Sequence, residues 1–179
     1  MRGRKGHFMK GYVQVYTGNG KGKTTAALGL AIRAAGAGLK VFIGQFIKMG
    51  EYSEIKALKR FADLITVEQF GIGGLIKGQP TPEDIEAAQK GLARIKSIMA
   101  SKEYHMVIME EANVAARLEL LSVQNLIDII DSKPEDIELV ITGRDADPAI
   151  ITKADLVTEM QEVKHYFQKG VAARVGIEK

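Results

Sequence analysis

The chain has 179 residues, of which 46% are hydrophobic and 26% are charged, and its formal net charge is +3. This length suffices for one domain with a buried core, and the composition is ordinary for a globular protein. The absence of cysteine excludes disulfides, thiolate metal sites and cysteine nucleophiles, and it fits a reducing cytoplasm. Because no run of about 18 apolar residues is present, we expect no membrane partner.

Much of the positive excess lies in the first ten residues. Such a segment could touch a phosphate ligand or nucleic acid, but a solvated tail is the more ordinary interpretation. No apolar segment follows it, so it does not read as a secretory signal. Elsewhere Lys and Glu are mixed and form no basic stripe. We therefore expect a basic tail over 1–10, one folded domain over 11–179, and no nucleic-acid partner.

Short β-rich runs alternate with helical stretches along the chain. Several runs, such as 107–109 and 139–141, are apolar throughout, as in strands buried on both faces of a parallel sheet. The predicted strands are Tyr12–Tyr16, Lys40–Gln45, Ile65–Gln69, His105–Met109, Glu138–Thr142 and Asp155–Met160. The predicted helices are Lys23–Ala37, Ser53–Phe61, Pro82–Ser101 and Ser122–Asp131. This alternation predicts a three-layer α/β fold with a mostly parallel central sheet and right-handed crossovers.

The helix predicted at Pro82–Ser101 has the clearest local signals. Thr81 suits the N-cap, Pro82 suits the first turn, and two acidic residues follow where the helix dipole favours them. Apolar residues then recur at spacings of three and four, which predicts one stripe packed on the core. That stripe consists of Ile85, Ala88, Leu92, Ile95 and Met99. The preceding stretch, 70–81, holds four glycines and is either a lid over a site or a loose connection.

Residues 18–24 read Gly-Asn-Gly-Lys-Gly-Lys-Thr and lie between a predicted strand and a predicted helix. The glycines allow several backbone N–H groups to point at one anion, and the helix adds the positive end of its dipole. Lys23 would reach the phosphate oxygens, and the Thr24 hydroxyl would hold a magnesium ion. The common pattern has glycine at position 17, where this chain has Thr17. The order of strand, loop and helix still predicts a nucleoside triphosphate site of the P-loop NTPase (RecA-like) type, at the carboxyl edge of the sheet.

An acidic pair follows the strand predicted to end at Met109. If that strand is next to the first one, at least one of the carboxylates of Glu110 and Glu111 would lie near Thr24. The more common pattern has aspartate at the first of the two positions, so we favour Glu111 as the metal ligand. A pair of glutamates beginning an exposed helix is the plainer alternative, and the buried strand before them argues against it.

Two arginines are further candidates for phosphate contacts. Arg144 follows the strand predicted to end at Thr142, so it points into the same crevice and could bind phosphate in a bidentate manner. Arg33 lies late in the first helix, where the sequence favours a helix-surface charge. The three histidines show no ligand spacing, so we expect no zinc site. The residues alone therefore predict a magnesium–ATP enzyme of the P-loop class and leave its reaction open.

These segments together resemble the P-loop corrinoid adenosyltransferases, whose substrates include cob(I)alamin and cob(I)yrinic acid a,c-diamide. The likeness runs from about Gly11 to Glu178, and members of this family also have Thr at position 17. It rests on the blocks Val-Tyr-Thr-Gly-Asn-Gly-Lys-Gly-Lys-Thr-Thr-Ala-Ala (15–27), Gln-Phe-Ile-Lys (45–48), Val-Ile-Thr-Gly-Arg (140–144), Ala-Asp-Leu-Val-Thr-Glu-Met (154–160), Val-Lys-His (163–165) and Gly-Ile-Glu (176–178). The resemblance implies a P-loop adenosyltransferase domain over 11–179.

In such enzymes a Co(I) corrinoid attacks C5′ of ATP and triphosphate leaves, as a step of adenosylcobalamin biosynthesis or salvage. The resemblance implies that Lys23, Thr24 and Glu111 are catalytic, and that Thr24 and Glu111 hold Mg²⁺ or Mn²⁺. It also implies a homodimer and a flavoprotein as the source of electrons. The implied nucleotide-binding residues are Gly18, Asn19, Gly20, Lys21, Gly22, Lys23, Thr24, Thr25, Arg33 and Arg144.

Two departures from the family pattern leave alternatives open. Members commonly have Asp-Glu where this chain has Glu110 and Glu111, and an aromatic pair Phe-x-Trp in the loop where this chain has only Phe70. In the family these aromatics are associated with removing the lower cobalt ligand before reduction. A small-molecule kinase or ATPase, and a non-catalytic module that binds ATP or corrinoid, are the alternative functions.

Overall fold

The computed structural model describes residues 10–73, 76 and 78–178. The expected basic tail over 1–10 therefore lies outside the described residues, except for Lys10. Part of the glycine-rich stretch 70–81 lies outside them as well. In the part of the chain that the structure describes, no helix is long and apolar enough to cross a membrane.

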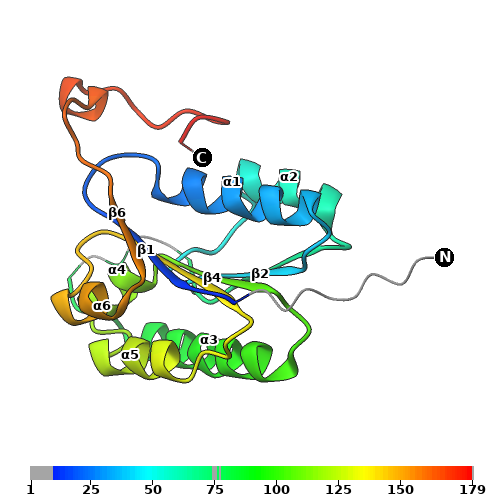
Figure 1. Ribbon diagram of the computed structural model, residues 1–179. Helices are drawn as coiled ribbons and strands as arrows, with labels where there is room; N and C mark the ends of the chain where they lie inside the picture. Colours follow the sequence, from blue (N-terminus) through cyan, green and yellow to red (C-terminus); the bar gives the residue numbers. More distant parts are fainter. Residues whose placement is uncertain (1–9, 74–75, 77, 179) are drawn as a thin grey trace.

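A six-stranded sheet forms the middle of three layers (Figure 1). Its strands lie in the order β3-β2-β4-β5-β1-β6, and each neighbouring pair is parallel. The strands are β1 (Val13–Thr17), β2 (Val41–Gln45), β3 (Ile65–Gln69), β4 (Met106–Glu110), β5 (Glu138–Thr142) and β6 (Leu156–Glu159). The predicted three-layer α/β fold and all six predicted strands are confirmed; β3 and β5 have the predicted bounds, and the bounds of the other strands differ by one residue. All carboxyl ends of the strands consequently lie at one edge of the sheet.

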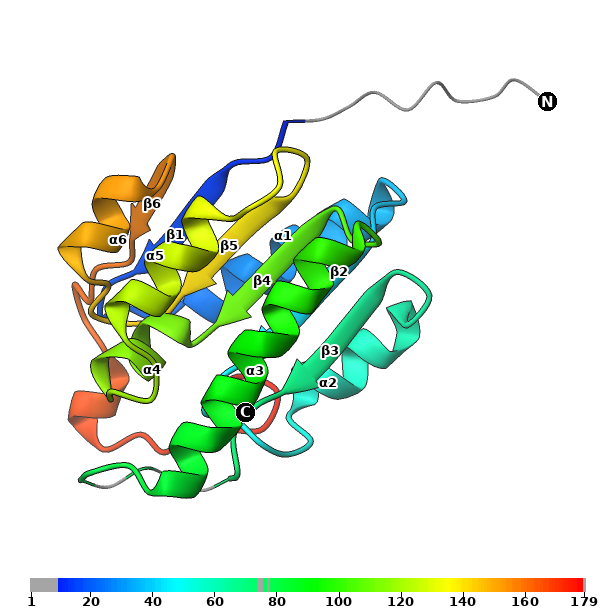
Figure 2. The same ribbon diagram turned by 90° about the horizontal axis from the view of Figure 1, so that it is seen from below.

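Helices cover both faces of this sheet, with α1 and α2 on one side and α3 to α6 on the other (Figures 1 and 2). The helices are α1 (Lys23–Gly36), α2 (Ser53–Leu58), α3 (Pro82–Ser101), α4 (Ala112–Arg117), α5 (Val123–Asp131) and α6 (Pro148–Lys153), with 3₁₀ turns η1 (Lys59–Phe61) and η2 (Tyr166–Lys169). The four predicted helices are confirmed. Sequence reasoning missed α4 and α6, because six residues are too few to show a helical period.

Two apolar clusters hold the layers together. The residues of α1 that pack on the sheet are small, namely Ala27, Ala31, Ala34 and Ala35. Small side chains let the helix lie close to the strands and bring the loop before it down to their carboxyl edge. On the other face, leucine and isoleucine side chains of α3 and α5 pack against alternate residues of the same strands.

Helix α3 begins as predicted, at a capping box. The Thr81 hydroxyl oxygen accepts from the Asp84 backbone N–H, and the Asp84 carboxylate accepts from the Thr81 backbone N–H. The predicted stripe is buried except at its start, where Ile85 is 38% exposed. The physical reason is length. A 20-residue helix spans about 30 Å, whereas a five-residue strand spans about 17 Å. The first turns of α3 therefore extend past the carboxyl edge of the sheet (Figure 2).

Candidate nucleotide site

The loop between β1 and α1, residues 18–22 (the nucleotide loop), forms a tight turn at the carboxyl edge of the sheet. Gly18 and Gly22 have φ angles of +90° and +130°, which side chains other than glycine rarely adopt. The Lys23 ammonium donates to the carbonyl oxygens of Gly18 at 2.6 Å and Gly20 at 2.8 Å. Burial, followed by the nearby Arg144 cation, lowers the pKa of Lys23. The loop thus holds a partly desolvated cation where the sequence predicts a phosphate group.

The chain that follows β6 braces this loop from outside. The Gly20 N–H donates to the carbonyl oxygen of Met160 at 2.6 Å. A Cβ atom on Gly20 would lie 2.7 Å from the carbonyl oxygens of both Met160 and Gln161. Because a carbon atom cannot approach backbone oxygens this closely, glycine is required here by close packing.

We expect Gly20→Ala to displace the loop and to weaken ATP binding at least tenfold, with a loss of about 1–3 kcal/mol in the free energy of unfolding. Gly29→Ala is the matched control, since a Cβ atom there meets nothing within 4 Å. In the interior of α1 this control should raise stability by up to about 1 kcal/mol. Titration calorimetry with ATP and thermal unfolding measure both effects. Unchanged ATP affinity in Gly20→Ala would contradict the packing argument.

Thr17, which departs from the common pattern, has a structural role of its own. It is the last residue of β1, it is buried, and its hydroxyl oxygen accepts from the backbone N–H of Ala146 at 3.1 Å. Ala146 lies just after Arg144 in the segment beyond β5. The side chain at position 17 thereby ties the start of the nucleotide loop to the segment that presents Arg144.

The carboxylate that reaches Thr24 is that of Glu110. The Thr24 hydroxyl donates to Glu110 Oε1 at 2.6 Å, and Lys48 Nζ lies 3.0 Å from the same oxygen. From the sequence, this contact is expected only if β1 and β4 are neighbouring strands. They are not neighbours, because β5 lies between them. Contact is made because α1 lies over β4 and β5 and carries Thr24 across.

Strand parity explains why the structure places Glu110 there. Side chains alternate between the faces of a strand. In β4, Val107 and Met109 pack in the cluster shared with α3, whereas Met106 and Ile108 pack in the cluster shared with α1. The next residue of the second set is Glu110, so its side chain faces α1.

Glu110 is fully buried, and its second oxygen, Oε2, has no hydrogen-bond partner among the described residues. Burial, with a smaller contribution from the Glu111 carboxylate, raises the pKa of Glu110 against the opposing effects of Lys48 and Thr24. Burial alone would lower the pKa of Lys48. The attraction and the hydrogen bond between Lys48 and Glu110 outweigh burial, so the pKa of Lys48 is raised. The pair therefore offers a desolvated carboxylate oxygen with unused capacity to bind a cation.

Glu111 lies at the same edge, one residue beyond the end of β4. It begins α4 with a φ angle of +61°, and its backbone N–H donates to the Thr142 hydroxyl at 3.0 Å. Its carboxylate acts electrostatically on Lys23 and on Lys48. The favoured ligand Glu111 thus lies within the charge cluster, while the direct contact with Thr24 belongs to Glu110.

The two predicted arginines end up in different places. Arg144 is exposed beside Lys23, on which it acts electrostatically. Arg33 is exposed in the last turn of α1, and its ten-residue separation from Lys23 corresponds to about 15 Å along the helix. The structure brings Arg144 to the nucleotide loop, and within this chain it does not bring Arg33 there.

Sequence reasoning missed Lys48 as a site residue. The tight turn after β2 positions this residue: the Lys48 N–H donates to the Phe46 carbonyl oxygen at 2.8 Å, and Ile47 between them has a φ angle of +70°. A β-branched residue in this conformation is strained, which is typical of functional positions. The signal was present in the sequence, since Lys48 ends the Gln-Phe-Ile-Lys block.

Phe70, the only aromatic residue of the stretch 70–81, is half-buried and packs against the core. Its ring lies 5.4 Å from that of Phe46, and it occupies the space that a Cβ atom on Gly91 would need. Two residues further on, Ile72 is 51% exposed. The ring of Phe70 therefore packs on the edge of the core, whereas Ile72 is an exposed apolar side chain.

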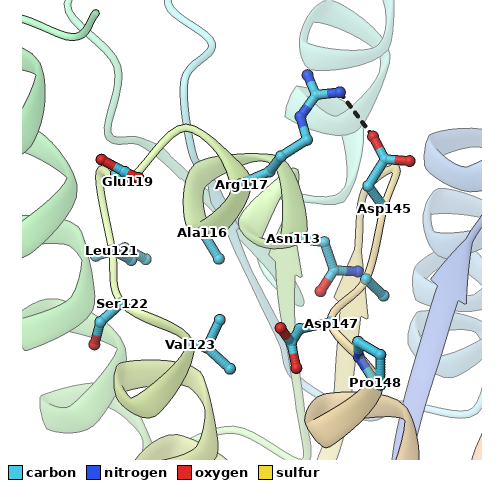
Figure 3. A pocket seen from close by; sticks show the side chains of 11 residues that line it. Asn113, Ala116, Arg117, Glu119, Leu121, Ser122, Val123, Asp145, Asp147 and Pro148 are labelled. Carbon is cyan, nitrogen blue, oxygen red and sulfur yellow. Dashed lines mark hydrogen bonds and ion pairs between the residues drawn. The ribbon is translucent and has the colours of Figure 1, made fainter.

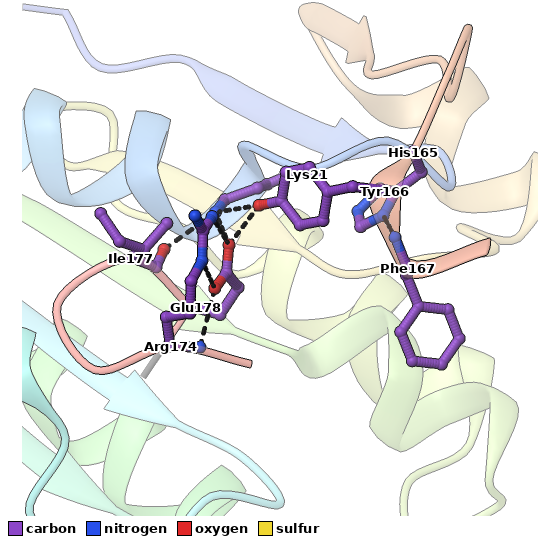
Figure 4. Close-up of polar contacts among 7 residues, drawn as sticks. All are labelled: Lys21, His165, Tyr166, Phe167, Arg174, Ile177 and Glu178. Carbon is purple, nitrogen blue, oxygen red and sulfur yellow. Dashed lines mark hydrogen bonds and ion pairs between the residues drawn. The ribbon is translucent and has the colours of Figure 1, made fainter. Parts of the chain in front are cut away.

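The C-terminal segment engages Lys21 of the nucleotide loop (Figure 4). The Lys21 ammonium contacts the Glu178 carboxylate at 2.8 Å, the Ile177 carbonyl oxygen at 2.9 Å and the Tyr166 hydroxyl at 3.2 Å. Tyr166 and Arg174 also bind the Glu178 carboxylate. Lys21, predicted to bind nucleotide, has its side chain turned toward the C-terminal segment. The predicted residues Asn19 and Thr25 flank this part of the loop and are exposed.

Glu178 makes the attachment of this segment sensitive to acid. Arg174, then Lys21 and Tyr166, lower the pKa of Glu178 far below its ordinary value. A lowered carboxyl pKa stabilises the folded arrangement above the ordinary pKa of about 4.3, and this contribution is lost as the pH falls below it. We therefore expect constant hydrogen-exchange protection of residues 171–178 from about pH 8 to about pH 5. Glu178→Gln should raise their exchange several-fold at neutral pH, whereas the control Glu162→Gln should not.

The chain is similar to known proteins over most of its length. Residues 9–178 match the family described as ATP:corrinoid adenosyltransferase BtuR/CobO/CobP. The chain is 34% identical to a corrinoid adenosyltransferase of Pseudomonas aeruginosa, over 94% of this chain and 84% of that protein. It is 32% identical to the corrinoid adenosyltransferase of Escherichia coli K12, over 94% of this chain and 86% of that protein. A corrinoid adenosyltransferase of a Sinorhizobium species is 34% identical over 94% of this chain and 80% of its own length. The resemblance in the sequence motifs is thereby confirmed, and the chain belongs to the ATP:corrinoid adenosyltransferase BtuR/CobO/CobP family.

Proposed function

We propose that this chain transfers the adenosyl group of ATP to the cobalt of a reduced corrinoid, in adenosylcobalamin biosynthesis or salvage. The lone pair of Co(I) forms the cobalt–carbon bond at C5′, the bond from C5′ to oxygen breaks, and its electron pair leaves with triphosphate. No proton has to be removed, so a general base is not required. The observation that carries the proposal is the glycine loop, with Lys23 and Arg144 converging on it, in a chain of this family.

The chain's own contribution is to bind and orient ATP and to stabilise the leaving group. Lys23 and the loop N–H groups would hold the triphosphate, and Arg144 would add a second cation at its edge. Fixed donors that neutralise developing charge are worth several kcal/mol in a site from which water is excluded. Because the electron pair comes from cobalt, positioning and charge neutralisation account for what the protein must do.

The residues beside the loop fit a magnesium or manganese ion. Thr24 supplies a hydroxyl, and Glu110 supplies a buried carboxylate oxygen with no partner among the described residues. Glu111 lies in the same charge cluster and remains a proposed ligand. Mg²⁺ usually binds one or two carboxylates together with substrate phosphates, and Glu110, Glu111 and the triphosphate would supply these groups here. When bound, the cation would neutralise charge on the triphosphate.

We also propose a cytoplasmic homodimer that receives electrons from a flavoprotein. The resemblance implies the homodimer and the flavoprotein, and the absence of cysteine fits a reducing cytoplasm. Exposed apolar side chains in the C-terminal segment support a subunit contact there, with Val163, Phe167 and Val175 at 93%, 73% and 79% exposure. Sedimentation velocity tests the dimer, and a monomer at micromolar concentration would contradict it.

The decisive experiment is anaerobic. Protein, magnesium-ATP and a chemically reduced Co(I) corrinoid are mixed, the corrinoid absorbance is followed, and the phosphate products are separated. We expect a light-sensitive alkylcobalt product and one triphosphate for each turnover. ADP with inorganic phosphate, and no alkylcobalt product, would favour the kinase or ATPase alternative. Binding of both ligands without turnover would favour the non-catalytic module.

A further inference from the structure

A second concave site lies beside the nucleotide loop, between α4 and α6 (Figure 3). Its volume is about 590 Å³, within the range of small-molecule sites. One wall is the segment Asp145–Ala146. Ala146 is hydrogen-bonded to Thr17 at the end of β1, and Asp145 acts electrostatically on Lys23. A ligand in this cavity would therefore lie next to a bound triphosphate.

A buried hydrogen-bond acceptor at this cavity lacks a partner. Asn113 is 1% exposed, and its Nδ2 group faces the carbonyl oxygen of Gly143 at 3.4 Å. That contact orients the amide and leaves Oδ1 without a partner in the part of the chain that the structure describes. The amide oxygen is directed into the cavity (Figure 3). An unpaired buried acceptor costs free energy until a donor reaches it, so the site favours a ligand group with N–H or O–H donors.

The rim of the cavity carries more negative than positive charge. Asp145 is paired with Arg117 at 2.7 Å, and both side chains are half exposed. Asp147 accepts from the backbone N–H of Ala149 at the start of α6, and Glu119 adds a further carboxylate. One cation among three carboxylates disfavours an anionic ligand group and leaves a neutral donor as the better match. The apolar part of the lining is formed by Ala116, Leu121 and Val123.

We propose that this cavity receives primary amide arms at the edge of the corrin ring and thereby selects amidated corrinoids over those with free carboxylates. The proposal rests on the proposed adenosyltransferase function. The apolar stem of an acetamide or propionamide arm would pack against Ala116 and Val123, and its NH₂ group would donate to Asn113 Oδ1. A carboxylate arm has no proton to donate at neutral pH and brings negative charge to the rim. Both effects act against the carboxylate.

The first test compares two Co(I) corrinoids with the unmodified protein at constant magnesium-ATP. Cobinamide has amidated arms, and cobyrinic acid a,c-diamide keeps several carboxylates. We expect kcat/KM to favour cobinamide about 10- to 100-fold, which is the size of one buried hydrogen bond with an added charge effect. Equal kcat/KM values would overturn the proposal. Absence of alkylcobalt product from both corrinoids would instead contradict the proposed function.

The second test reverses one rim charge. Glu119 is exposed, so Glu119→Lys should fold, and it should shift the preference at least about tenfold toward the carboxylate corrinoid. Glu103→Lys makes the same charge change at the opposite edge of the sheet, before β4, and should leave the preference unchanged. The Kd values of both Co(II) corrinoids, measured by absorbance titration without ATP, should move in parallel with kcat/KM. A folded, active Glu119→Lys variant with the original preference would overturn the proposal.

A third test uses Asn113→Leu, which removes the acceptor Asn113 Oδ1 and keeps a side chain of similar size. We expect about a tenfold or larger rise in the Kd of cobinamide, with the Kd of ATP unchanged. Unchanged cobinamide binding in a folded variant would overturn the role of Asn113. If this buried substitution prevents folding, the Glu119→Lys comparison still decides whether the cavity contacts the corrinoid arms.

Discussion

Lys23→Ala is expected to lower kcat/KM for adenosyl transfer by about 10³-fold, with most of the loss in kcat. In the structure the Lys23 ammonium is held between two loop carbonyl oxygens and is partly desolvated. In the proposed reaction the triphosphate gains negative charge as the C5′–oxygen bond breaks. A cation fixed at that position stabilises the transition state more than bound ATP, so its removal acts on kcat beyond its effect on binding.

Stopped-flow absorbance of the alkylcobalt product, with triphosphate quantified in parallel, measures this loss. Lys40→Ala is the matched control, because Lys40 is an exposed lysine just before β2, at the opposite edge of the sheet. It should retain the unmodified rate. The unfolding temperature of Lys23→Ala should remain close to that of the unmodified protein. The substitution removes two hydrogen bonds to loop carbonyl oxygens, but it also removes the free-energy cost of desolvating the ammonium group. A Lys23→Ala enzyme with its rate intact would contradict the proposed site.

Glu110→Gln should lower kcat/KM by about 10²-fold and raise the magnesium concentration needed for half-maximal rate. Glutamine keeps the shape of the side chain, and its amide oxygen can still accept from Thr24. It removes the charge, and with it the unpartnered carboxylate oxygen that a cation would bind. It also leaves Lys48 without its counter-ion, so we expect a loss of about 1–3 kcal/mol in the free energy of unfolding.

Glu111→Gln is the informative partner, because the sequence favours Glu111 as the metal ligand. Rates are measured over a magnesium titration for both variants. A raised magnesium requirement in Glu110→Gln identifies Glu110 as a ligand. If only Glu111→Gln raises the requirement, and Glu110→Gln is slow at every magnesium concentration, Glu111 binds the cation and Glu110 positions Thr24. If both variants keep the full rate, neither carboxylate serves the reaction.

The features that the sequence predicted well are those in which neighbouring residues decide the structure. The glycine loop, the start of α1 and the capped start of α3 each depend on a few consecutive residues. The apolar runs predicted strands buried on both faces, and the parallel pairings confirm them. Chain order also placed Arg144 at the carboxyl edge, because every strand of a parallel sheet ends there.

Other features needed the tertiary structure, because they depend on residues far apart in the chain. The strand order separates β1 from β4, and only the position of α1 brings Thr24 to Glu110. Strand β4 is apolar on both faces, so its sequence shows no alternation of polar and apolar residues. The sequence therefore does not indicate which of the two adjacent carboxylates, Glu110 or Glu111, faces α1. The contact between Lys21 and Glu178 joins residues 157 positions apart.

The sequence by itself thus determined the fold class, the position of the glycine loop between β1 and α1, and the family, since each depends on local patterns and short motifs. Only the tertiary structure decided the contact of Glu110 with Thr24, the part taken by Lys48, and the cavity into which Asn113 directs its free oxygen. The physical reason is that local patterns fix backbone conformation, whereas the partners and burial of a polar side chain depend on how distant elements pack.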